Sequence, residues 1–394
     1  MNAIISLCFI FVVYAIGDII SVKTKSIVSS LFTCSVLFLI GFWFGVPADL
    51  FQQANLFQIG AVIIPVLLVH MGSMIDLEQI KAQWKTLIIA FAAVIGVAIT
   101  VLGVGQFLVE REAAVIAAPP IAGGIIAGIQ MSEAANTIGR EDLAVLATLL
   151  VVIQGFVGYP IASICLKKEG RRVLEQYRLQ GGDFHETLAE DKVEKKKLIR
   201  PLSEKYVGSN LLIAKTMIIG VLAVVISTKV QEAVGFNLLD KNVLALLLGI
   251  LFYAIGFLDS SILIKANGFG FMIAALMAVI FANLSTATPE MIGSLLPIIV
   301  TTLALGTVGI LVFSFIVGKL LNVSKYMATA IGISALFGFP GTYIISQEVS
   351  NALGENEEER KVVLDSMLPQ MLVAGFVTVS IASVILAGIM APML

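Results

Sequence analysis

The sequence predicts an all-α polytopic membrane protein made of two inverted five-helix repeats, each carrying a re-entrant hairpin. Three features lead to this prediction: the composition, a series of long apolar runs, and two stretches rich in Gly and Pro at matching places in the two halves. Hydrophobic residues make up 58% of the 394-residue chain and charged residues only 13%. Soluble domains carry about 25% charged residues. A water-facing surface cannot be built from so little charge, so we expect the chain to lie in a lipid bilayer.

Apolar runs of about 20 residues are the signature of membrane-spanning helices. Their continuous character favours helices over strands, in which apolar and polar residues alternate. We place five runs in the first half and five in the second, with approximate bounds 3–21, 27–45, 56–75, 86–109, 142–165, 211–228, 242–258, 267–284, 291–318 and 362–391.

A charged linker divides these runs into two equal sets. We expect the first repeat over 1–166, the linker over 167–210 and the second repeat over 211–394. Between Lys167 and Lys205 the chain holds eleven Lys and Arg against eight Asp and Glu. Such a basic segment is typical of a solvated cytoplasmic loop, and nothing else in the sequence suggests a surface that binds nucleic acid.

The distribution of basic residues predicts the orientation of the chain, because cytoplasmic loops carry an excess of Lys and Arg. With the linker inside and both termini outside, nine basic residues fall inside and four outside, provided that each hairpin returns to the side from which it enters. The inside set is Lys23, Lys25, Lys81, Lys85, Lys265, Lys319, Lys325, Arg360 and Lys361, and the outside set is Arg111, Arg140, Lys229 and Lys241. We expect the inner membrane of a bacterium.

The two hairpins are expected at about 113–139 and 327–354, each between the fourth and fifth run of its half. A shift of 215 positions aligns the four pairs Gly123/Gly338, Glu133/Glu348, Asn136/Asn351 and Gly139/Gly354. Because the first half begins outside and the second begins inside, the two similar units would have opposite orientations. Inverted repeats are typical of secondary transporters with a binding site near the middle of the membrane.

Both hairpins combine helix-breaking residues with glycine. In the first, Pro119 and Pro120 remove backbone donors and are expected to break the helix. Glycines at the hairpin tips permit tight turns and close approach of the backbone to a ligand. Helix N-termini exposed by such breaks attract anions, and freed carbonyls can hold cations. The predicted substrate site comprises Gly123, Gly124, Gly128, Gln130, Ser132, Glu133, Ser334, Gly338, Pro340, Gly341 and Thr342.

Three polar residues beyond the tips are expected to help bind sodium: Asn136, Asn351 and Ser346. His70 lies in the third run and is a further candidate for contact with substrate or with a proton. Each of these polar residues could instead bond a neighbouring helix. No HExxH, GxSxG, Walker A or CxxC pattern occurs, so we expect no enzymatic activity, no metal beyond sodium and no organic cofactor.

With these residues in view, the chain resembles the glutamate:sodium symporter family, which is related to the 2-hydroxycarboxylate (citrate) transporters. The resemblance rests on the two Gly-rich hairpins, on the run from Ile64 to Asp76, on the run around Ala274–Leu284 and on the cytoplasmic linker. It implies an elevator-type homodimer, in which a mobile domain holding the hairpins slides against a fixed scaffold, with sodium as coupling ion.

The expected function is therefore sodium-coupled symport of glutamate or a similar small amino acid or carboxylate. Two alternatives remain open. A proton-coupled exporter or exchanger of a small organic anion could be built on the same fold, with His70 or Glu133 as the titrating group. A channel-like pore is the other, because hairpins also build pores. Transport that responds to pH and ignores sodium would favour the exporter, and conductance without saturation would favour the pore.

Overall fold

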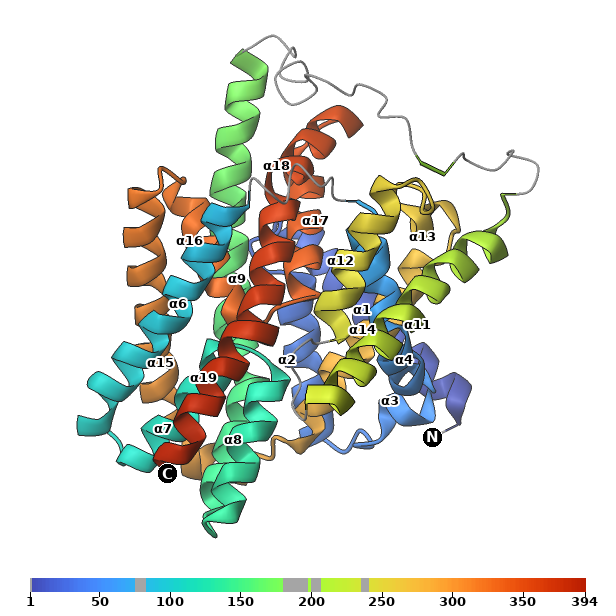
Figure 1. Cartoon of the computed structure of the whole chain (residues 1–394). Coiled ribbons are helices and arrows are strands. Elements are labelled where there is room, and N and C mark those ends of the chain that lie inside the picture. The colour runs from blue at the N-terminus through green and yellow to red at the C-terminus, as the bar shows by residue number, and fades with distance from the viewer. Residues whose placement is uncertain (1, 75–82, 180–197, 200–206, 235–240) are drawn as a thin grey trace. The chain divides into compact units, whose positions relative to one another are not determined.

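The computed structural model describes residues 2–74, 83–179, 198–199, 207–234 and 241–394. These residues form helices joined by short turns, and no strand occurs among them (Figure 1). The all-α class is thereby confirmed. Lys81 and most of the expected linker lie outside the described residues.

Seven helices among the described residues are long and apolar enough to cross a membrane. Three further apolar helices, Ser30–Trp43, Leu56–Gly72 and Leu244–Ala254, are shorter, with 10 to 17 residues. Each of the ten apolar runs expected from the sequence lies on one of these helices. Backbone groups in hydrocarbon must be satisfied within the segment, and helices do this. The chain is accordingly a multi-pass helical membrane protein.

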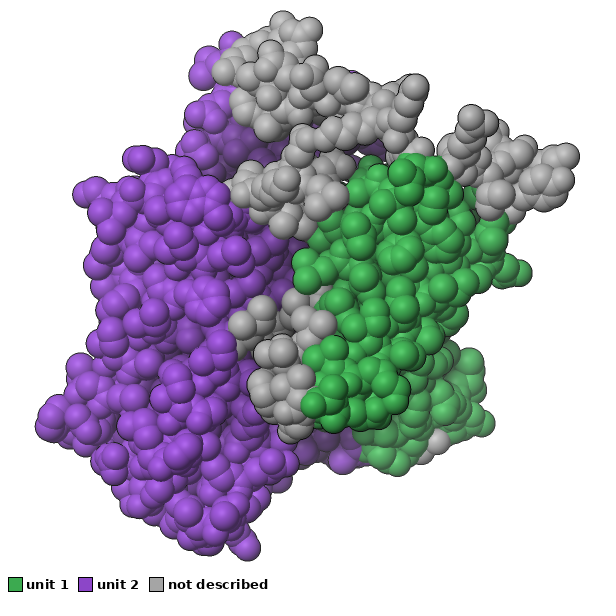
Figure 2. Space-filling view, in the orientation of Figure 1, with its two compact units in different colours: residues 1–7, 49–82, 182–282 green, residues 8–48, 83–181, 283–394 purple. Residues whose placement is uncertain are grey.

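The chain divides into two compact units, drawn in different colours in Figure 2. Unit 1 comprises residues 1–7, 49–82 and 182–282, and unit 2 comprises residues 8–48, 83–181 and 283–394. The described helices of unit 1 are α3 (Leu50–Gln53), α4 (Leu56–Gly72), α11 (Ser209–Val234), α12 (Lys241–Ala254), α13 (Ile262–Lys265) and α14 (Phe269–Ala282).

Helix α4 is the centre of unit 1 and packs against α11, α12 and α14. Glycine permits the close approach of α4 to α12. A Cβ atom on Gly72 would lie 2.5 Å from the carbonyl oxygen of Leu246, which is closer than atoms in a packed core can come. Small residues at helix crossings let backbones meet in membranes, where the hydrophobic effect does not drive helix association.

Unit 2 contains both hairpins. Its elements are α1 (Ala3–Lys23, from Cys8 onward), α2 (Ser30–Trp43), α6 (Trp84–Gly103), η1 (Gly105–Phe107), α7 (Arg111–Ala122), α8 (Ile125–Thr137), α9 (Glu141–Leu179), η3 (Asn283–Thr286), α15 (Pro289–Leu320), α16 (Lys325–Ile333), η4 (Ser334–Leu336), α17 (Gly341–Leu353), α18 (Glu357–Phe376), the π-helical turn η5 (Val377–Ala382), α19 (Ser383–Met390) and η6 (Ala391–Met393).

Two helical segments hold the hairpins in place. Helix α9 contacts all four hairpin arms, α7, α8, α16 and α17. The last segment does the same, since α18 contacts α16 and α17 while α19 contacts α7 and α8. The hairpins are therefore packed between the fifth helix of the first half and the last helical segment of the chain.

Helix α9 is longer than the sequence analysis predicts. It continues from the apolar run through Lys167 to Leu179, so the first part of the expected linker is helical. The continuation is amphipathic, because Leu166, Gly170, Val173, Leu174 and Tyr177 are buried and recur at helical spacing. At about 1.5 Å per residue, the 39 residues of α9 span roughly 58 Å, well beyond a hydrocarbon core of about 30 Å.

Candidate functional site

The first hairpin breaks at two glycines. Helix α7 ends at Ala122, and α8 begins at Ile125. Between them Gly123 has φ 137° and Gly124 has φ 91°, values that residues with a Cβ atom rarely adopt. The sequence-based expectation that Pro119 and Pro120 break the helix is wrong in position. Both lie within the last turn of α7. The fixed φ of proline is compatible with a helix, and each proline there removes only the hydrogen bond that its own backbone N–H would have donated.

The second hairpin breaks differently. Helix α16 passes into the 3-10 turn η4, and the chain then turns at residues 337–340 before α17 begins at Gly341. Gly338 has φ 58° and the Phe339–Pro340 peptide bond is cis. Both outgoing helices, α8 and α17, start at a hairpin tip and are 13 residues long. Each tip therefore presents the N-terminus of a helix.

The two hairpins enter unit 2 from opposite ends of α9. At the open end of the first, Arg140 forms ion pairs with Glu110 at 2.9 Å and with Asp142, in the first turn of α9, at 2.9 Å. At the open end of the second, Leu353 lies against Gly170 near the other end of α9. The two tips therefore point toward each other along α9, as α7–α8 and α16–α17 show in Figure 1.

A third element, the π-helical turn η5, meets both tips. A Cβ atom on Gly123 would lie 2.9 Å from the carbonyl oxygen of Thr378 and 3.2 Å from that of Ala335. One on Gly124 would overlap the carbonyl oxygen of Val379. One on Gly338 would lie 2.5 Å from Cγ1 of Val379. Residues from both halves of the chain therefore converge on one turn of the last helical segment, and glycine permits this contact.

Sequence reasoning missed this turn, because the run 362–391 reads as one apolar helix. π-helical turns are often found at functional sites. The available signal was polar: Thr378 and Ser383 are hydroxyl residues within the run, and both are fully buried. The hydroxyl of Thr378 donates to the carbonyl oxygen of Ala374 at 2.9 Å, whereas Ser383 Oγ has no hydrogen-bond partner in the described part of the chain.

The site carries no side-chain charge of its own. Residues 119–132, 334–347 and 366–393 contain no Asp, Glu, Lys or Arg. The polar groups that gather at the tips are backbone amides at the start of α8 and α17, and the carbonyl oxygens of Ala335, Thr378 and Val379. Oriented amides can stabilise an anion and clustered carbonyls a cation, in a place where water does not compete.

Most predicted residues of the second hairpin lie at its tip and are buried. Ser334 Oγ donates to the carbonyl oxygen of Ile331 at 2.7 Å, and Ser346 Oγ donates to that of Thr342 at 2.7 Å. Gly341 packs against the ring of Phe337. Thr342 Oγ1 differs from these hydroxyls, because it is buried and has no partner among the described residues. It lies beside Gly375 of α18, where a Cβ atom would be 3.0 Å from it.

The predicted residues of α8 lie at increasing distances from the tip along the helix. Gly128 packs against Val151 of α9, and Gln130 and Ser132 are half-buried. Glu133 and Asn136 are exposed in the structure. Asn136 is 12 positions beyond Gly124, or about 18 Å along the helix axis at 1.5 Å per residue.

Asn351 is similarly placed, since it is exposed and 10 positions beyond Gly341, about 15 Å along α17. The structure therefore does not bring the two asparagines to the tips, and their role at sodium remains a prediction. The physical reason is simple: a regular helix carries its residues steadily away from the turn at which it starts.

Glu348, which the shift of 215 positions pairs with Glu133, lies in a different environment. Its Oε1 accepts hydrogen bonds from the backbone N–H of Ser30, at 3.0 Å, and from the Ser30 hydroxyl. Ser26 Oγ donates to the Glu348 carbonyl oxygen at 2.9 Å. This carboxyl group therefore fixes α17 to the first turn of α2, where the helix dipole favours a negative charge.

His70 lies in unit 1, near the end of α4. Its side chain is fully buried, its Nδ1 accepts from the backbone N–H of Leu263 at 3.2 Å, and its ring lies 4.7 Å from that of Phe269. These contacts give it a structural role in joining α4 to α13 and α14. Its expected contact with substrate remains a prediction.

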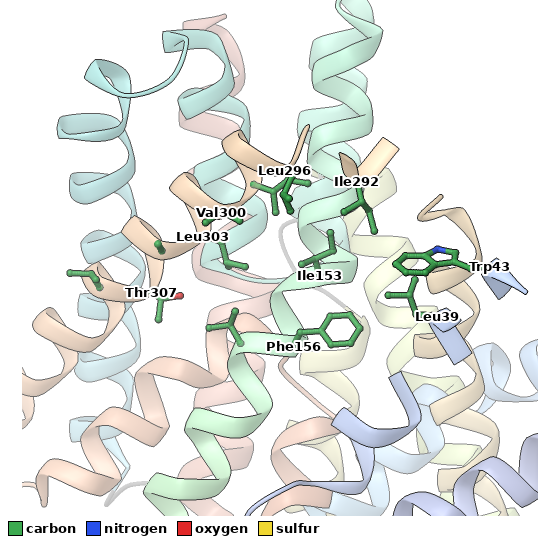
Figure 3. A pocket seen from close by; sticks show the side chains of 13 residues that line it. Leu39, Trp43, Ile153, Phe156, Ile292, Leu296, Val300, Leu303 and Thr307 are labelled. Carbon is green, nitrogen blue, oxygen red and sulfur yellow. The ribbon is translucent and has the colours of Figure 1, made fainter. Parts of the chain in front are cut away.

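A separate cavity of about 630 Å³ lies in unit 2 between α2, α9 and α15 (Figure 3). Its lining is apolar except for Thr307, and it includes Trp43, Ile153 and Phe156. None of the hairpin residues lines it. A carboxylate would lose its hydration there and would find only the Thr307 hydroxyl as a hydrogen-bond partner, so the cavity suits hydrocarbon better than the expected substrate.

No protein-family model matches this chain, and no curated protein sequence matches it.

Proposed function

We propose that this chain is a secondary transporter that couples the symport of glutamate, or of a similar small amino acid or carboxylate, to sodium. The observation that carries the proposal is the convergence of both hairpin tips on the turn η5, with Gly123 against the carbonyl oxygens of Ala335 and Thr378. Broken helices that meet at membrane depth are the usual form of a transporter binding site.

The chemistry of the tips fits both solutes. The N-termini of α8 and α17 would stabilise a substrate carboxylate. The carbonyl oxygens of Ala335, Thr378 and Val379 would serve sodium, which binds through oxygen ligands and needs no charged residue if the carboxylate accompanies it. In this proposal backbone carbonyl oxygens at the tips, and not the side chains of Asn136 and Asn351, are the sodium ligands.

The distribution of charge in unit 2 supports the proposed orientation. Lys167 Nζ donates to the carbonyl oxygen of Lys25 at 2.5 Å, and the side chains of Lys168 and Lys325 both lie over the ring of Tyr326. These residues, expected inside, share one end of unit 2. At the other end Arg140 is surrounded by three acidic residues. An excess of basic residues at one end is typical of the cytoplasmic face.

We further propose that the protein works as an elevator-type homodimer in a bacterial inner membrane, with both termini outside. Unit 2 would be the moving part, because it contains both hairpins and the two helical segments that hold them. Unit 1 would belong to the scaffold.

The decisive experiment is uptake by the purified full-length protein in sealed liposomes. Labelled glutamate and related amino acids are added outside, with a sodium gradient or with an equal gradient of potassium. We expect saturable accumulation that requires sodium. Accumulation that follows a proton gradient and ignores sodium would overturn sodium coupling and indicate the exchanger. Conductance without saturation would overturn the transporter in favour of a pore.

A further inference from the structure

The buried polar residue Gln154 lies in the apolar run of α9, and no hydrogen bond within the described residues uses its amide oxygen. Its side chain is only 3% exposed, and its Oε1 is buried without a hydrogen-bond partner among the described residues. Thr342 Oγ1 and Ser383 Oγ share this property, whereas several other buried polar side chains in unit 2 are satisfied by the backbone. Thr302 Oγ1, for example, donates to the carbonyl oxygen of Ile298 at 2.7 Å, and Ser314 Oγ to that of Ile310 at 2.6 Å.

A buried amide oxygen without a donor is unfavourable, because it has lost its hydration and gained nothing in return. Such an orphaned group in a native protein calls for an explanation, and a bound ligand is one. The position of Gln154 decides which ligand is relevant.

Gln154 lies on the face of α9 that touches both hairpins. Three positions before it, Val151 packs against Gly128 of the first hairpin. Four positions after it, Gly158 packs against Leu336 and Phe337 at the tip of the second. At about 1.5 Å per residue these contacts are roughly 4.5 Å and 6 Å from Gln154 along the helix axis. Residues three and four apart share one helix face.

The adjacent face of α9 serves a different purpose. Ile153, Phe156 and Val157 line the apolar cavity of Figure 3. A polar residue on that face would meet only hydrocarbon. Gln154 is bracketed by Val151 and Gly158, which contact the hairpins, and the Leu336 that Gly158 contacts is the neighbour of Ala335, whose carbonyl oxygen faces Gly123.

The apolar run of α9 and the two tip segments contain no carboxylate that could pair with a cationic group. Residues 143–166 of α9 carry no charged side chain, and neither do the tip segments 119–132 and 334–347. A substrate ammonium group in this place would have to bind neutral acceptors, of which a side-chain amide oxygen is a strong one. The amide N-termini of α8 and α17 are donors and suit the carboxylate, not the ammonium group.

We propose that Gln154 recognises the ammonium group of an amino-acid substrate, with its Oε1 as the acceptor. The inference rests on the proposed function and deepens it, because it selects amino acids over carboxylates that lack nitrogen. A site built to bond a polar group rejects analogues without that group, since its own polar atom is then left unpaired.

The test compares glutamate with glutarate, which has the same two carboxylates and no amino group. Each compound is used to compete with labelled glutamate for sodium-driven uptake into liposomes. For the wild-type protein we expect glutamate to bind at least tenfold more tightly than glutarate. In Gln154→Leu we expect the affinity for glutamate to fall at least tenfold and that for glutarate to change less than threefold, so that the preference disappears.

Gln370→Leu is the matched control. Gln370 lies on α18, and its amide is already bonded, since Nε2 donates to the carbonyl oxygen of Ser366 at 3.1 Å. Its replacement should leave the glutamate-to-glutarate ratio unchanged. Should Gln154→Leu fail to fold, Gln154→Met keeps the length of the side chain and is measured in the same way.

The outcomes separate the two proposals. If the wild-type protein takes up glutamate with sodium and the Gln154 variant keeps the wild-type ratio, the role of Gln154 is overturned and the transporter stands. If the wild-type protein binds neither compound in either salt, the proposed function fails and the role of Gln154 fails with it.

Discussion

Gly123 of the first hairpin lies directly against the carbonyl oxygen of Thr378 in the last helical segment, so closely that a methyl group on Gly123 would come within 2.9 Å of that oxygen. The two residues are 255 positions apart, from 123 to 378. Their contact joins the two halves of the chain at a point where both hairpins end.

This contact predicts that the tip tolerates no side chain. In Gly124→Ala the new methyl group would overlap the carbonyl oxygen of Val379. The backbone of Gly124, with φ 91° and ψ 151°, also lies in a region that is essentially restricted to glycine, where another residue costs about 1–3 kcal/mol. We expect uptake to fall at least tenfold while the protein still inserts in the membrane. Uptake per molecule of purified protein measures the effect.

Gly388→Ala is the control for the tip variant, because a Cβ atom there meets nothing within 4 Å. It should keep wild-type uptake. Normal uptake by Gly124→Ala would contradict the placement of the site at the tips. Gly341→Leu, which would collide with Phe337 on the second tip, should lose uptake in the same way.

The hydroxyl of Thr342 is expected to contact the transported solute, because it is buried at a tip and has no partner among the described residues. Thr342→Val removes the hydroxyl and keeps the shape. We expect unchanged or slightly raised thermal stability, since an unsatisfied buried group disappears, and a substrate affinity at least tenfold weaker. Thr342→Ser keeps the hydroxyl and should therefore keep the substrate affinity of the wild type.

Thr302→Val makes a fair comparison for Thr342→Val, since Thr302 is equally buried but already bonds Ile298. It should leave substrate affinity within threefold of the wild-type value. Equal losses of affinity in both variants would show that the Thr342 effect is general loosening of the fold.

Glu348 predicts an effect on stability. Replacement by Ala leaves the N–H and hydroxyl of Ser30 without their acceptor, and an orphaned buried donor costs about 1–3 kcal/mol. Glu348→Gln keeps an oxygen in the same place and should cost less. Thermal unfolding in detergent gives the order wild type, Gln, Ala; an Ala variant as stable as the wild type would show that this link between α17 and α2 contributes nothing.

The cluster around Arg140 predicts a dependence on pH. The guanidinium of Arg140 holds the pKa of the Glu110 carboxyl below its ordinary value, mainly through a side-chain hydrogen bond. A carboxyl whose pKa is lower in the folded than in the unfolded state stabilises the fold above its unfolded pKa, and that contribution is lost as pH falls through the folded pKa. Arg140→Gln should therefore lower the melting temperature at pH 7 and have less effect below about pH 4.

Because these side chains are largely exposed, the difference should be small and should shrink in 0.5 M salt, where the Debye length is only a few ångströms. Melting curves of the wild type and Arg140→Gln at both pH values and both salt concentrations provide the measurement. A difference that stays constant with pH and salt would mean that Arg140 acts through packing and not through charge.

Much of the helical framework could be predicted from the sequence, because hydrocarbon requires long apolar helices and leaves little choice. The ten runs and the two hairpin segments fall within a few residues of helices in the structure. The extension of α9 to Leu179 was also readable, since Leu166, Gly170, Val173 and Tyr177 repeat at helical spacing. The high charge of this segment led us to interpret it as a loop.

The details of the candidate site were harder to predict, because they depend on contacts between distant segments. Glycine at 123 and 338 signals a turn, but not which carbonyl oxygen the turn will face. The π-helical turn at Val377–Ala382 contains no glycine or proline, so these residue types give no indication of it in the sequence. The exposed positions of Asn136 and Asn351 follow from the helix rise, which moves each residue about 1.5 Å further from its tip.

The length of α9 has a consequence for how the protein could be observed. Gly158, beside the second tip, and Leu179, at the exposed end of the helix, are 21 positions apart on one continuous helix, a rod of about 32 Å. A stiff rod transmits displacement from one end to the other with little loss. The side chain of Leu179 is 87% exposed. A spectroscopic probe attached there would therefore report any movement of α9 that begins at the buried hairpins.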